Sequence, residues 1–317
     1  MDSLWTFSRR RKQSRAVGTL AKIDAVVNWQ ALVNIVQIID KSNTDKGGRN
    51  PLPFEWKVKM LFLQYAFNLS DEELEDQRID RLCFQKFVGI NFDQEIPDFP
   101  TLWYFKEALL LHQLMDRIFS SINLQLELNG LILKKGTLAD ATIIESENRP
   151  LSKQKREELE SKPSAQIDTL AQSTEKNGNK FFGYKGHIGV DVESKIIRKR
   201  KFTSANVHDS QAFEAVLSGD EKSIWADKAY TNDKHKRIAR AMGIFYGVLD
   251  KKKKGSALSG KQIRRNKQMS SVRAAVDHSF AFMCKKLKMG LASAKNKARN
   301  TLRFDMNCIV YHVLRAS

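Results

Sequence analysis

GTLADATII, residues 136–144, is the stretch on which the fold prediction turns. It is short and rich in Thr and Ile, which is typical of a strand. It follows a long region of helical pattern. Four more strands are predicted downstream, at FFGYKGHIGVDVE (181–193), IIRKRKFTSA (196–205), SIWADKAY (223–230) and IFYGVL (244–249). A tight turn at 193–195 joins the first two of these.

Apolar residues at helical spacing surround the strands. Upstream of the strands, helical patterns start near Ile23 and near Phe54. Ser70 and Glu73 form a capping box, which predicts that a third helix begins at Ser70. A long helix that carries Leu102 then follows and ends at Gly130. Downstream, helices are expected over 209–218, 233–242, 270–289 and 298–315. This order predicts an α/β fold, a mixed sheet flanked by helices, preceded by an all-helical N-terminal domain.

Three parts of the chain are predicted: a basic N-terminal arm at 1–17, a helical domain at 18–130 and the α/β domain at 131–317. The polar segment 145–180 reads as a solvent-exposed insertion with one short helix. The arm contains SRRRKQSR (8–15), which would either lie along a phosphate backbone or form a solvated terminus.

The formal net charge is +18 and the pI is about 9.7, so we expect a polyanionic partner, nucleic acid or an acidic membrane surface. No apolar run approaches the roughly 18 residues of a membrane span. Cys83, Cys284 and Cys308 form no CxxC pair, which argues against a structural zinc site and a disulfide scaffold and fits a reducing compartment.

Two aspartates stand in or at the end of predicted strands. Asp140 interrupts a run of Leu, Ala, Thr and Ile, where an unpaired carboxylate would be costly to bury. Asp227 lies near the end of SIWADKAY, where open α/β sheets place ligands. The alternatives are a structural cap or lysine pair for Asp140, and a salt bridge to Lys228 or an arginine for Asp227.

Asp277 is the sole carboxylate between residues 251 and 303, in a segment crowded with lysine and arginine. It borders the buried stripe of its helix, and Arg273 is four residues earlier on the same side. The plain alternative is an ion pair between the two, worth a few tenths of a kcal/mol. If Asp277 instead converges with Asp140 and Asp227, the three make a hard oxygen site for two Mg²⁺ or Mn²⁺ ions, suited to cutting a phosphodiester.

Other motifs are weaker. GSALSGKQ (255–262) almost matches a P-loop, but Gln262 stands where Ser or Thr should ligate magnesium, so we read it as a basic, flexible loop. The six histidines show no metal-ligand spacing, although His187 and His278 lie close in sequence to the suspected site. Cys284 is a weak nucleophile candidate.

The blocks GTLADATII, FFGYKGHIGVD, SANVHDSQAF, IWADKAY and RAAVDHSFAFMCKKLK together resemble bacterial insertion-sequence transposases, in the group named after insertion sequence 5. PLPFEWKVKMLFLQYAFNLSDEELEDQ and PDFPTLWYFKEAL are similar to that group's helical N-terminal region. The blocks span roughly residues 50 to 290, and their order and spacing carry the resemblance.

The resemblance implies an RNase H-like core with an Asp, Asp, Glu triad for two divalent ions. The acids fall on Asp140, Asp227 and Asp277, where the third is aspartate instead of glutamate. The family has two basic residues around the third acid. The first falls on Arg273, which matches. The second, a lysine in the family, falls on Cys284, and Lys285 or Lys286 could take its place. Ser270 stands where tyrosine is expected. Lys185 and Lys228 complete the expected DNA-binding set.

The implied function is a DNA transposase. Its helical region would bind terminal inverted repeats, and its core would hydrolyse a phosphodiester at the transposon end and transfer the freed 3′-hydroxyl to target DNA. A homodimer or larger assembly on double-stranded DNA, in the bacterial cytoplasm and at the nucleoid, is expected. One rival is a transposase-derived DNA-binding protein without activity. The other is a membrane-surface protein, which needs an amphipathic helix with a basic polar face. The apolar residues of the C-terminal helix are better explained by packing in the core.

Overall fold

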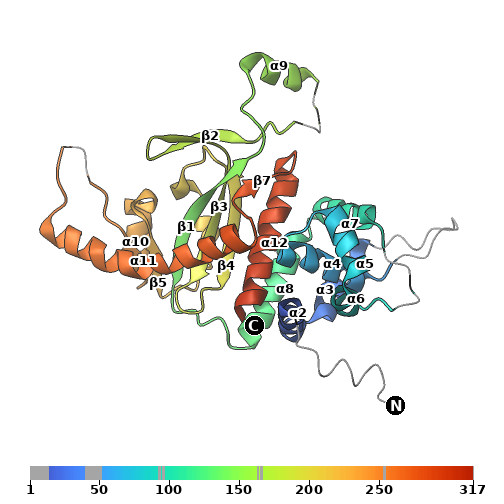
Figure 1. Ribbon diagram of the computed structural model, residues 1–317. Coiled ribbons are helices and arrows are strands. Elements are labelled where there is room, and N and C mark those ends of the chain that lie inside the picture. The colour runs from blue at the N-terminus through green and yellow to red at the C-terminus, as the bar shows by residue number, and fades with distance from the viewer. Residues whose placement is uncertain are drawn as a thin grey trace. The chain divides into compact units, whose positions relative to one another are not determined.

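The computed structural model describes residues 14–39, 52–91, 94, 97–162, 164, 167–252 and 255–316 (Figure 1). Residues 1–13, most of the expected basic arm, lie outside them. Contacts divide the chain into two units. One ends at Leu114 and also includes the residues from Val313 onward, and the other is Met115–His312.

The first unit is helical, as the apolar spacing predicted. Its elements are α2 (Arg15–Val26), α3 (Trp29–Val36), η1 (Gln37–Ile39), α4 (Phe54–Phe67), α5 (Asp71–Asp80), α6 (Leu82–Val88) and α7 (Phe99–Leu111). The predicted capping box begins α5, since Ser70 Oγ accepts from Glu73 N at 3.0 Å and Glu73 Oε2 accepts from Ser70 N at 2.7 Å. Trp29 packs edge-on against Phe62 and Phe87 in the core.

The single long helix predicted from Leu102 to Gly130 is wrong. α7 ends at Leu111, and a separate helix, α8 (Met115–Leu128), begins after a break at which Gln113 has a φ of 53°. The apolar spacing continues through the buried Leu114 and Met115, so periodicity alone cannot detect the break. The division between the two units falls here in the sequence, so contacts group α8 with the second unit, whereas the helical region was expected to extend to residue 130.

The second unit is built on a seven-stranded mixed sheet. Its strands are β1 (Thr137–Ser146), β2 (Gln172–Lys176), β3 (Asn179–Asp191), β4 (Ile197–Ser204), β5 (Ser223–Ala226), β6 (Phe245–Val248) and β7 (Leu291–Ala292). β1 and β4 each pair antiparallel with β3, and β5 runs parallel to both β1 and β6. Three antiparallel strands continued by two parallel ones confirm the expected RNase H-like fold.

The other elements of the second unit are α8, α9 (Lys153–Ser161), α10 (Asp233–Ala241), α11 (Gly260–Lys286), η2 (Asp209–Gln211), η3 (Glu214–Val216) and η4 (Lys228–Tyr230), together with α12 (Lys297–Ala316) as far as His312. The helix predicted over 209–218 is wrong, because two short 3₁₀ turns take its place. The polar insertion holds the expected short helix, α9, and also β2, which was not predicted. β7 was not predicted either.

α11 begins ten residues earlier than predicted. Ser259 and Gln262 form a capping box in which Gln262 Oε1 accepts from Ser259 N at 2.9 Å. The end of GSALSGKQ is therefore the first turn of a helix, and the flexible-loop interpretation is wrong for these residues. The early start gives α11 27 residues, enough to cross the sheet (Figure 1).

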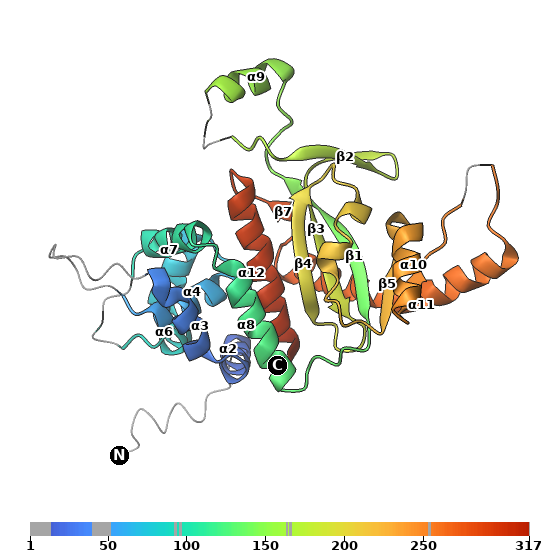
Figure 2. The ribbon, with the colours of Figure 1, turned by 180° about the vertical axis from the view of Figure 1, so that it is seen from behind.

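Two glycines of β3 show how the sheet is covered. A Cβ on Gly186 would strike the Phe304 ring of α12, and a Cβ on Gly189 would strike the Val216 carbonyl of η3. Since residues three apart in a strand face opposite ways, α12 covers one face and the 3₁₀ turns cover the other, as the reverse view in Figure 2 shows. Among the described residues, none of the helices is long and apolar enough to cross a bilayer.

Candidate active site

The strand register brings Asp140 and Asp227 together. β1 and β5 are parallel neighbours in which Ala139 lies opposite Ala226, so the next residue of each chain segment is an aspartate at the same level. Neighbouring strands are about 4.8 Å apart, which puts the two carboxylates within reach of one small ligand. The sequence predicted their strands but not the register that aligns them.

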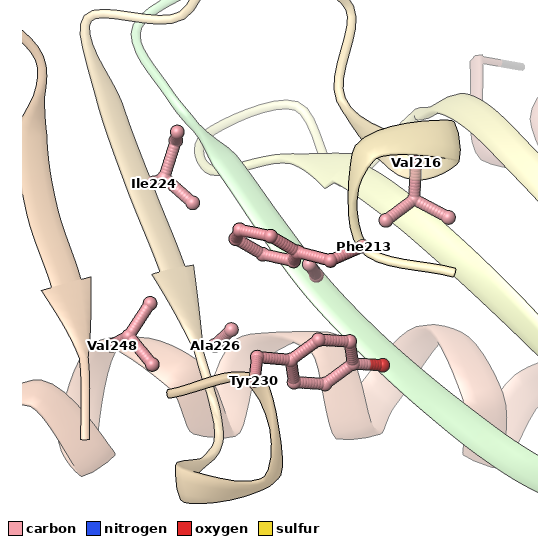
Figure 3. Close-up of a cluster of buried hydrophobic side chains, with 7 residues drawn as sticks. Phe213, Val216, Ile224, Ala226, Tyr230 and Val248 are labelled. Atoms are coloured by element: carbon pink, nitrogen blue, oxygen red, sulfur yellow. The ribbon is translucent and has the colours of Figure 1, made fainter. Parts of the chain in front are cut away.

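A hydrophobic cluster fixes both strands under the acids (Figure 3). It contains Ala139, Phe213, Val216, Ile224, Ala226, Tyr230 and Val248, all buried. The two alanines leave room for the rings of Phe213 and Tyr230, whose centroids are 5.3 Å apart. Because successive residues of a strand face opposite ways, Asp140 projects from the other face of the sheet, toward α11.

Asp140 is held by two hydrogen bonds. Oδ2 accepts from Arg273 Nη1 of α11 at 3.1 Å, and Oδ1 accepts from Ala141 N at 2.8 Å. Its side chain is 16% exposed. The carboxylate is therefore paired across the face of the sheet with a helix 133 residues away in sequence, and not with a lysine or a helix end as the structural alternative required.

Burial raises the pKa of Asp140 to about 6. The Ala141 amide and the Arg273 guanidinium oppose this rise in pKa, while the negative charges of Asp277 and Asp227 add to it. Asp227 and Asp277 therefore each lie close enough to Asp140 to act on it electrostatically.

Asp227 and Asp277 occupy different settings. Asp227, half-buried, ends β5 and caps η4, where its Oδ1 accepts from Lys228 N at 2.7 Å. Asp277 is exposed on α11, beside the buried Val276, as the border position predicted. No ion pair between Arg273 and Asp277 occurs in the described part of the chain, since the guanidinium is bound to Asp140 instead.

The donor set suits a hard divalent cation. Three carboxylates whose negative charges disfavour one another gain from a bound Mg²⁺ or Mn²⁺, and oxygen is the ligand that these ions prefer. Within the described ranges, however, no three acidic, histidine or cysteine side chains are grouped closely enough to hold a metal ion as they stand. The charges of Asp227 and Asp277 act on Asp140, but the three acids do not form a coordination shell.

The predicted basic residues divide into two kinds. Lys285 and Lys286 are exposed in the last turn of α11, and Lys228 is exposed in η4. Lys185 is engaged within the protein, since its Nζ donates to Val207 O and to Asp209 Oδ1, both at 3.0 Å. Cys284 is half-buried, and burial raises the pKa of its thiol, which does not favour a nucleophile.

Sequence reasoning named Lys185 and His187 but missed Asp209, with which they form a polar group on the opposite face of the sheet. Lys185 and Asp209 form an ion pair there, beside buried His187, whose Nε2 lies 2.9 Å from Thr203 Oγ1. Burial lowers the pKa of His187 to about 4, so it is neutral at ordinary pH. The blocks FFGYKGHIGVD and SANVHDSQAF contained these residues, but nothing in their spacing indicated that the strands would place them together.

Two family models match the helical region and the α/β region of the chain. Residues 7–108 match the family model described as Transposase domain (DUF772), and residues 133–313 match the one described as Transposase DDE domain. The chain is also similar to the piggyBac transposase, in a cryo-EM structure of its synaptic complex with hairpin DNA. That match has 10% identity and a TM-score of 0.44, and covers 95% of this chain and 74% of the other. Since the DDE model covers more than half of the sequence, the chain belongs to the transposase DDE domain family.

Proposed function

We propose that this transposase is an insertion-sequence enzyme of the group named after insertion sequence 5, and that it cuts and joins DNA at the ends of its element. The observation that carries the proposal is the alignment of Asp140 with Asp227 at the ends of parallel strands, with Asp277 in electrostatic reach. Transposases act on DNA, and the charge of +18 supplies the long-range attraction for it.

Members of the DDE family generally use divalent metal ions, and we propose two Mg²⁺ or Mn²⁺ ions here. Asp140 and Asp227 would hold both ions, and Asp277 would complete the shell of the second. Such ions, when bound, stabilise the charge on the attacking and leaving oxygens of a phosphodiester. Asp140 would then be ionised, because a cation offsets the burial and repulsion that raise its pKa.

The basic side chains around the acids would hold the DNA. The exposed ammonium groups of Lys228, Lys285 and Lys286 would meet the phosphates. Arg273, now on Asp140, would turn to the scissile phosphate when ions replace it. Lys185 is also proposed to contact DNA, which would require its ammonium to leave Asp209. The helical first unit would bind the terminal inverted repeats.

Both ends of an element must be held for joining, so we propose a homodimer or larger assembly on DNA. The third acid is aspartate, one methylene shorter than the glutamate of the family, and α11 would have to shift toward the sheet for its carboxylate to reach an ion. We expect the protein to act at the bacterial nucleoid.

A second candidate is a transposase-derived protein that binds DNA without cutting it. One observation favours it: Asp140 is bound to Arg273, and the described residues contain no ready-made metal cluster. This candidate predicts tight binding of end DNA with no nicking in any divalent ion.

Strand cleavage of DNA carrying the element's ends separates the two. The wild-type protein should nick this DNA in Mg²⁺ or Mn²⁺ and not in EDTA, while Asp140→Ala and Asp227→Ala should bind it without nicking. Asp116→Asn is a matched control, because Asp116 is 92% exposed on α8. If either alanine variant cleaves at the wild-type rate, the metal-site proposal fails.

A further inference from the structure

The first half of α11, residues 260–271, is called here the projecting half, because it takes no part in the core. The buried residues of α11 are Val276, Ser279, Phe280 and Met283, all in its second half. Figures 1 and 2 both show the first half reaching past α10, beyond the sheet. A helix without an apolar face packed on a core is marginal in water, so other contacts must hold this segment.

Two side chains fix the projecting half to the edge of the sheet. β6 ends the strand order, and Arg265 donates to two of its carbonyls, to Tyr246 O at 2.7 Å and to Val248 O at 2.9 Å. Asn266 exchanges two hydrogen bonds with the backbone of Asp250, at 2.8 and 3.1 Å. The inner face of the segment is therefore anchored, and its other face is left to solvent.

The solvent-facing side of the projecting half carries only positive charge. Lys261, Arg264 and Lys267 are all exposed and recur every third residue, which places them along one face of the helix. The surrounding sequence, residues 251–276, has nine lysine or arginine residues and no aspartate or glutamate. In the described part of the chain, the ion pairs of α11 involve other residues, so these three charges are not neutralised within the protein.

The spacing of these charges favours a polyanionic partner. Like charges three residues apart on a helix repel one another, and a polyanion removes the repulsion, whereas a second copy of the same surface would increase it. Of residues 260–271, only Ile263 is a large exposed apolar side chain, which is too little for insertion into a membrane surface. Lysine and arginine bind the phosphates of DNA without reading its bases.

We propose that the projecting half of α11 is a second DNA-binding surface, which binds the backbone of the same duplex that passes the three acids. This inference rests on the proposed function, because that function supplies the duplex. Lys267 is ten residues before Asp277, and a helix rises about 1.5 Å per residue, so the two lie about 15 Å apart along the axis. That is the length of about four base pairs, so the surface holds DNA to one side of the point of cleavage, whatever its sequence.

Fluorescence anisotropy of a labelled DNA duplex of arbitrary sequence, titrated with full-length protein at several salt concentrations in EDTA, tests this surface. The triple variant Lys261→Gln, Arg264→Gln, Lys267→Gln removes the three charges and keeps good helix formers, so its melting temperature should not change. Each phosphate contact contributes about 0.9 to the slope of log affinity against log salt, so the slope should fall by about 2.7. At about 0.1 M salt the variant should bind DNA more weakly than wild type by about tenfold or more.

The triple variant Lys199→Gln, Lys201→Gln, Lys222→Gln is the matched control, since it removes the same charge from exposed lysines. Lys199 and Lys201 alternate with Arg200, which pairs with α12, so they lie on the opposite face of the sheet. Lys222 precedes β5, at the end of the strand remote from Asp227. The control should keep the affinity and the salt slope of wild type.

Equal affinities and equal slopes in the two triple variants would overturn this inference and leave the proposed cleavage untouched. A wild-type protein that binds the duplex as predicted but never nicks end DNA would overturn the proposed cleavage and support this surface. A wild-type protein that does not bind the duplex at all would overturn both.

Discussion

Replacing Asp140 by asparagine should stabilise the protein at neutral pH while removing its activity. The pKa of Asp140 rises from 3.8 to about 6, chiefly through burial. This rise in the pKa corresponds to about 3 kcal/mol, by which the ionised carboxylate destabilises the fold at high pH. Asp140→Asn has nearly the same shape and no charge to bury.

The pH dependence gives the prediction its sign. The folded protein keeps a proton on Asp140 that the unfolded chain releases above about pH 4, so wild type loses stability as the pH rises from about 4 to 6. The variant has no such loss. Its advantage over wild type should therefore grow by about 2 kcal/mol between about pH 4.5 and pH 8.

Urea unfolding of the second unit measures this difference. Trp225 of β5 lies beside the site, and fluorine NMR of fluorotryptophan-labelled protein resolves its signal from the tryptophans of the first unit. The comparison of variant with wild type cancels all other titrations. A difference that stays flat with pH, or that shrinks as the pH rises, would refute the account of Asp140.

Three further outcomes are expected. Asp277→Glu should retain or raise DNA cleavage, since the longer side chain reaches nearer to the other acids; complete loss in a nicking assay would mean that the pocket is built for aspartate. Arg273→Gln removes a charge that lowers the pKa of Asp140, so the acidic limb of the pH–rate profile for DNA cleavage should move to higher pH. An acidic limb at the same pH as in wild type would contradict the interaction between Arg273 and Asp140. Gly186→Ala should lower stability by about 1–3 kcal/mol in thermal denaturation, because its Cβ would strike Phe304, whereas Gly260→Ala, with open space around it, should not; equal melting temperatures would contradict the packing described for α12.

Much of the sheet could be predicted from the sequence. All five strands expected from Thr, Ile and aromatic content exist, within a few residues of their expected bounds. β2 was missed because QSTEK (172–176) carries no apolar alternation, and its pairing with β3 supplies what its composition does not. The break at Gln113 was missed because apolar residues continue through it.

The candidate site was predicted as residues and not as geometry. Composition and position marked Asp140, Asp227 and Asp277, and Arg273 beside the last of them. That Arg273 would bind Asp140 in place of its helix neighbour depends on how α11 crosses β1, which no local pattern contains. Tyr230 and Asp209 were overlooked for the same reason, since their position beneath the acids arises from the packing of η2 and η4.

Iron-directed backbone cleavage tests most directly whether the three acids share a metal site. Fe²⁺ bound in place of Mg²⁺ generates hydroxyl radicals with ascorbate and peroxide, and these cut the chain only near the ion. We predict fragments with ends near Asp140, Asp227 and Asp277 together, all suppressed by excess Mg²⁺ and absent from Asp140→Asn. Cuts near one of these residues without the others, or cuts that persist in the variant, would contradict a shared site.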